Sequence, residues 1–61
     1  MNEVQYYVIK IDGDVSKIAF SHEEATEYAN NYDCEVFGSC DSDEGIRFLT
    51  QVYPDGKEEL L

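Results

Sequence analysis

The stretch SHEEATEYANNY, residues 21–32, decides the fold. Ser21 can cap a helix while Glu24 bonds back to the Ser21 amide, which makes a capping box. The apolar residues that follow fall at the i, i+3, i+4, i+7 spacing of one helical stripe: Ala25, Tyr28, Ala29 and Tyr32. We therefore predict a helix that begins after Ser21, ends near Asn30-Asn31 and packs this stripe on another element. Phe20, before the cap, is expected to contact Ala25 as a hydrophobic staple.

Strand patterns flank this helix on both sides. Residues 4–11 and 16–20 precede it, joined by the turn sequence Asp12-Gly13-Asp14, and residues 34–40 and 46–53 follow it. Residues 41–45 form an acidic loop, and Pro54-Asp55-Gly56 is a turn before residues 57–61, which form a short last strand or fray. The sequence predicts one small α+β domain over residues 1–61, in the order ββαββ. Its antiparallel sheet has four strands, or five if residues 57–61 also pair, and the helix packs on one face.

Alternation along the strands predicts two sheet faces. The first hairpin has either a two-residue or a four-residue loop, and both registers leave the same side chains on the same face. The face expected under the helix carries Tyr7, Ile9, Ile11, Ile18, Phe20, Cys34, Val36, Cys40, Ile46, Phe48 and Val52.

The opposite face is also largely apolar, with Ala19, Lys10, Lys17 and Glu35 among its residues. A single helix cannot cover both faces, so we expect self-association through the second one. The candidate interface residues are Val4, Tyr6, Val8, Phe37, Leu49, Tyr53 and Arg47. The alternative is a monomer in which Lys and Arg stems cover scattered aromatic residues.

Charge restricts the partners. The chain has 61 residues and a formal net charge of −10. This charge argues against direct binding to nucleic acid or to an anionic membrane, since both require basic contacts, and favours a basic protein surface. Solubility alone is the competing explanation. No apolar run approaches the ~18 residues of a membrane span, and the start Met1-Asn2-Glu3-Val4 lacks signal-peptide features, so a cytoplasmic location is expected.

No set of residues indicates catalysis or a resident cofactor or metal. His22 has no nearby Ser, Cys or metal-ligand partner in the sequence, and Cys34 and Cys40 are expected to be buried free thiols. The loop Asp41-Ser42-Asp43-Glu44-Gly45 fails the EF-hand pattern, because Gly45 occupies ligand position 5 and Val52 occupies position 12. We therefore expect a protein that is not an enzyme.

The leading hypothesis is a small acidic protein-binding module, a homodimeric inhibitor that blocks a basic surface such as the nucleic-acid groove of an enzyme. Its acidic partner-binding residues would be Glu23, Glu24, Glu27, Asp33, Asp41, Asp43 and Glu44. In size, charge and element mix the chain resembles the small acidic inhibitors of phages, some of which imitate DNA and some of which block bacterial defence systems. The resemblance implies an anti-defence role and assigns no residue.

Two alternatives remain open. One is an oligomeric sponge that sequesters a nucleotide signal, which would need Lys10, Lys17 and Arg47 clustered at a subunit interface. The other is a host accessory dimer without inhibitory function.

Overall fold

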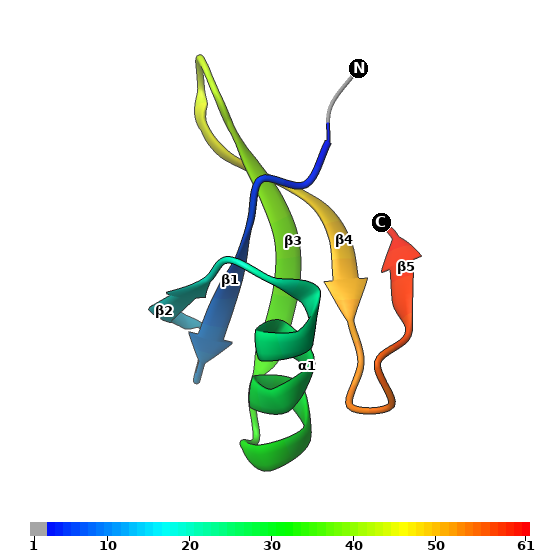
Figure 1. Cartoon of the computed structure of the whole chain (residues 1–61). Coiled ribbons are helices and arrows are strands. Elements are labelled where there is room, and N and C mark those ends of the chain that lie inside the picture. Colours follow the sequence, from blue (N-terminus) through cyan, green and yellow to red (C-terminus); the bar gives the residue numbers. More distant parts are fainter. Residues whose placement is uncertain (1–2) are drawn as a thin grey trace.

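A five-stranded antiparallel sheet carries one helix across one of its faces in the computed structural model, which describes residues 3–61 (Figure 1). The elements are β1 (Tyr6–Ile11), β2 (Asp14–Ala19), α1 (His22–Asn31), β3 (Glu35–Ser42), β4 (Gly45–Val52) and β5 (Glu58–Leu60). The strands lie side by side in the order β2-β1-β3-β4-β5. This confirms the α+β prediction, and the short last strand forms at the edge of the sheet. Met1 and Asn2, on which part of the signal-peptide expectation rests, lie outside the described residues.

The helix begins and ends where the sequence predicts. Ser21 has extended backbone angles, and its Oγ accepts a hydrogen bond from the Glu24 amide at 3.1 Å. Ala25 and Ala29 are buried against the sheet, and the chain returns to extended backbone at Tyr32. Phe20 is 79% exposed, so the expected staple with Ala25 does not form.

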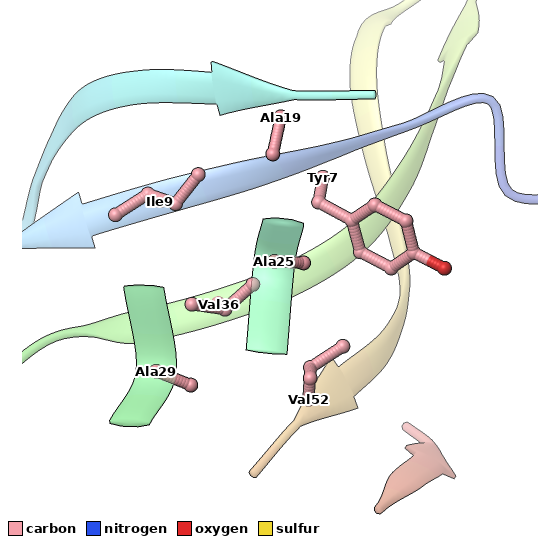
Figure 2. Close-up of a cluster of buried hydrophobic side chains, with 7 residues drawn as sticks. All are labelled: Tyr7, Ile9, Ala19, Ala25, Ala29, Val36 and Val52. Carbon is pink, nitrogen blue, oxygen red and sulfur yellow. The ribbon is translucent and has the colours of Figure 1, made fainter. Parts of the chain in front are cut away.

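A small core lies between α1 and the sheet. The buried cluster consists of Tyr7, Ile9, Ala19, Ala25, Ala29, Val36 and Val52 (Figure 2). Alanines on the helix and on β2 allow a close approach of backbone to backbone, so few large side chains are needed to fill the space. Both cysteines are free thiols, as predicted, and Cys40 is buried, whereas Cys34 is only half-buried where it packs against this cluster. Ile11 is 39% exposed, which corrects its expected place in the core.

A β-bulge in the first hairpin reverses the expected face of β2. Ile9 pairs with Lys17 and Lys10 with Val15, which leaves Ser16 as an extra residue on β2. One extra residue exchanges the faces of everything beyond it.

The outcome is visible in burial. Ala19 lies opposite Tyr7 and is fully buried, whereas Ile18 is 39% exposed. The predictions that Ile18 and Phe20 lie in the core, and that Ala19 lies on the sheet face opposite the helix, are therefore wrong. Lys17 also lies on the helix side, where its Nζ is 5.8 Å from the centre of the Tyr28 ring.

A second bulge reverses the expected face of the first part of β4. Gly38 pairs with Thr50 and Ser39 with Phe48, so Leu49 is the extra residue. Ile46 and Phe48 consequently lie on the face away from α1 and are 49% and 37% exposed, which corrects their expected place in the core. The hairpin itself turns at Asp43-Glu44, because β3 and β4 pair as far as Ser42 and Gly45.

Candidate functional site

The sheet face opposite α1, called the open face from here on, is the main uncovered surface. The strand register places on it Tyr6, Val8, Lys10, Val15, Ile18, Phe37, Ile46 and Phe48. Phe37 and Phe48 stack with ring centroids 5.0 Å apart, and the Lys10 Nζ lies 5.9 Å and 5.6 Å from the two centroids. These neighbours cover Val8, which is fully buried although no helix lies over it.

One end of the open face is hollowed. A groove of about 370 Å³, called the hairpin groove from here on, is lined by Tyr6, Ile18, Phe20, Asp41 and Ile46. The Tyr6 hydroxyl donates a hydrogen bond of 2.7 Å to Asp41 Oδ1. This bond, with a smaller contribution from burial and from the Asp41 charge, raises the pKa of Tyr6 above its usual value.

The predicted interface residues do not all share this face. Tyr6, Val8 and Phe37 lie on it, and Tyr53 adjoins it, since its hydroxyl reaches Gln51, the partner of Phe37.

The other three expected interface residues lie elsewhere. Val4 packs against the core cluster instead, and Arg47 pairs with Cys40 on the helix side of the sheet. Leu49 is the half-buried bulge residue. The expected gathering of basic residues on the open face is wrong, because Lys10 alone of Lys10, Lys17 and Arg47 lies there.

The predicted acidic residues fall into two groups. The helix group is Glu23, Glu24, Glu27 and Asp33, and the hairpin group is Asp41, Asp43 and Glu44. The β3–β4 hairpin extends away from α1, so the two groups do not form one continuous surface (Figure 1). Glu24 and Glu27 line a shallow groove beside Tyr28 and Tyr32. Asp43 and Glu44 line another with Ile46 and Arg47, next to the hairpin groove.

Most of these carboxylates lack a basic neighbour. Across residues 3–61, Lys57 with Glu59 at 3.3 Å is the one ion pair made by a lysine or arginine. His22 Nε2 lies 3.6 Å from Glu58 Oε1, an ion pair only when the imidazole is protonated. The negative charge of the described residues is therefore largely uncompensated by ion pairs.

A polar cluster that sequence reasoning missed joins β5 to the rest of the fold. Glu58 Oε2 accepts a hydrogen bond from Thr50 Oγ1 at 2.8 Å, and Glu58 Oε1 accepts one from the Tyr7 hydroxyl at 3.2 Å. His22 lies edge-on to the Tyr7 ring, with centroids 6.2 Å apart. Burial, followed by the Glu58 charge and hydrogen bond, raises the pKa of Tyr7. Nothing in the sequence distinguishes Glu58 from its acidic neighbour Glu59.

The cysteines and acidic loops show no catalytic arrangement. Cys34 Sγ donates to the Tyr28 carbonyl at 3.4 Å, and burial raises the pKa of this thiol, which disfavours the nucleophilic thiolate. Cys34 follows the end of α1, whereas His22 begins it. In the described part of the chain, no three side chains of His, Cys, Asp or Glu converge as metal ligands.

Comparisons with protein-family models, with curated proteins and with solved structures gave no match to this chain. Within residues 3–61, no helix has the length and apolar character needed to cross a membrane.

Proposed function

We propose that this protein is a non-catalytic module that binds, and thereby blocks, a basic surface of another protein. The observation that carries the proposal is the uncompensated acidity: a net charge of −10, with one lysine–carboxylate ion pair in the described residues. Such a surface accelerates and orients association with a basic partner. A protein groove that binds nucleic acid is the natural class of target, because it is already lined with Lys and Arg.

The placement of the cations favours this function over a nucleotide sponge. Phosphate capture would need Lys10, Lys17 and Arg47 together. Lys10 lies over Phe37 and Phe48 on the open face, whereas Lys17 lies over Tyr28 on the helix side. Arg47 belongs to the β3–β4 hairpin, opposite Cys40. The three cations of one chain are therefore dispersed and do not supply a phosphate site among themselves.

Homodimerisation through the open face stays a prediction. Apolar side chains on that face would favour it, since small domains gain stability by association. The charge opposes it, because two copies that each carry −10 repel.

Affinity capture with charge variants tests the proposal. The immobilised protein is incubated with a bacterial lysate at about 0.1 M and at about 1 M salt, between which the screening length falls from about 10 Å to about 3 Å. We expect capture of basic proteins at the lower salt and their release at the higher salt. Each acidic group is then neutralised separately, as E23Q/E24Q/E27Q and as D41N/D43N/E44Q, and we expect at least one of these triple variants to lose the captured protein.

The two triple variants are matched controls for each other, because each removes three charges from a different end of the molecule. Capture that survives both variants, and survives high salt, would show that the acidity serves only solubility.

A further inference from the structure

We infer that the hairpin groove, with the acidic hairpin beside it, is the surface that contacts the partner, and that it takes a basic amphipathic segment. The inference rests on the proposed function and adds which end of the molecule binds and what chemistry it recognises. Neither the groove nor its apolar lining follows from the sequence pattern, which assigned Ile18, Phe20 and Ile46 to the core.

The lining of the groove is apolar and exposed. Ile18 comes from the end of β2, Phe20 from the segment before α1 and Ile46 from β4. They are 39%, 79% and 49% exposed, so large apolar surfaces face solvent at a shallow, open site. Exposed apolar patches of this kind mark surfaces that contact protein partners.

The charge beside the groove selects the partner. Asp41 lines the groove itself, and its carboxylate is held by the Tyr6 hydroxyl, which fixes one acceptor at a defined position. Asp43 and Glu44 follow on the same hairpin, with Arg47 as the cation beside them. A lysine or arginine placed next to an apolar anchor would therefore meet three carboxylates within one short hairpin.

A second copy of the chain fits this site less well. A two-fold dimer uses the same patch on both subunits, so the hairpin acids of one copy would approach the same patch of the other. Like charges brought together across an interface oppose association. A segment that presents apolar residues on one side and Lys or Arg on the other would contact both the apolar lining of the hairpin groove and the carboxylates of the hairpin group.

The test is an NMR titration of the isotope-labelled full chain with a synthetic helical peptide that has leucine on one face and lysine on the other. A lysine–serine peptide of the same length and charge is the control. We expect the leucine–lysine peptide to shift the amide signals of Tyr6, Ile18, Phe20 and residues 41–47, and to bind at least about tenfold more tightly than the control peptide.

Variants locate the binding. We expect F20S and I46S each to weaken binding of the leucine–lysine peptide by about tenfold, whereas L60S leaves it unchanged. Leu60 is the matched control because it is 86% exposed on β5, away from the groove. The variants replace exposed side chains, and the amide spectrum of each one reports directly whether it is folded.

Three results would overturn the inference. Equal binding of the two peptides would mean that charge alone acts, which leaves the proposed function standing without the groove. Shifts confined to α1 would assign binding to the helix group. If the amide signals of the groove residues shift when the protein alone is diluted, a second copy of the chain covers the groove. The proposed function fails separately, if lysate capture survives both triple variants and high salt.

Discussion

The aromatic rings of Phe37 and Phe48 stack with their centroids 5.0 Å apart on the sheet face that α1 leaves open. Phe48 reaches this position because Leu49 is an extra residue in β4, which turns the preceding side chains to the other face. With Lys10 nearby, the pair covers Val8 and gives the open face a small apolar cluster of its own. The sheet is thus stabilised on both sides, although only one side has a helix.

This stacking predicts a measurable coupling. Replacing Phe37 and Phe48 by Leu, singly and together, should give a coupling free energy of about 0.5–1.5 kcal/mol, the range typical of aromatic pairs. Urea unfolding of the four proteins measures it. Additive effects would show that the rings do not interact in solution.

Gly38 is predicted to be the glycine least tolerant of a side chain. A Cβ at this position would overlap Thr50 Oγ1 and lie 2.9 Å from Val4 Cγ2. We expect Gly38→Ala to lower the free energy of unfolding by about 1–3 kcal/mol, the usual cost of overpacking. In a Thr50→Ala background, where Oγ1 is absent, the same substitution should cost less. An equal cost in both backgrounds would contradict the close approach.

The helix cap gives a third prediction. Ser21→Ala removes the acceptor for the Glu24 amide and should destabilise the fold by about 1 kcal/mol. Ser21→Asp keeps an acceptor and should retain most of the stability. Thermal unfolding followed by circular dichroism distinguishes the two variants, and similar losses for both would argue against a capping role.

The raised pKa of Tyr7 predicts that the stability of the fold depends on pH in the alkaline range. Burial and Glu58 raise its pKa in the folded state above the ordinary tyrosine value of 10.0, so the unfolded state releases this proton first. The contribution of Tyr7 to stability is therefore complete below about pH 10 and is lost as the pH rises through the folded-state value. In Tyr7→Phe the unfolding free energy should fall less steeply above about pH 10 than in the wild type. Parallel pH profiles of the two proteins would contradict the role of Tyr7.

Local sequence signals predict the elements well. Ser21 and the Ala25–Ala29 spacing locate the helix, and β-branched and aromatic residues locate the strands, because these preferences act over a few neighbouring residues. Four of the five sheet residues in the core cluster, Tyr7, Ile9, Val36 and Val52, follow from simple alternation.

The two faces could not be predicted completely, because each bulge changes the alternation by one residue. Ser16 and Leu49 carry no signal that separates a bulged strand from a regular one. Ala19 offers a hint, since a small residue between larger ones suits the side on which the helix packs closely. The hairpin groove could not be foreseen because Ile18 and Ile46 reach it through these shifts in register, and Phe20 follows directly after the shifted strand β2.

Amide hydrogen exchange of the protein alone, and in complex with the partner recovered by affinity capture, tests the central claim most directly. Binding through the hairpin groove predicts slower exchange at Tyr6, at residues 18–20 and at residues 41–47, with little change along α1. Slower exchange confined to α1, or no change in the residues that line the groove, would contradict it.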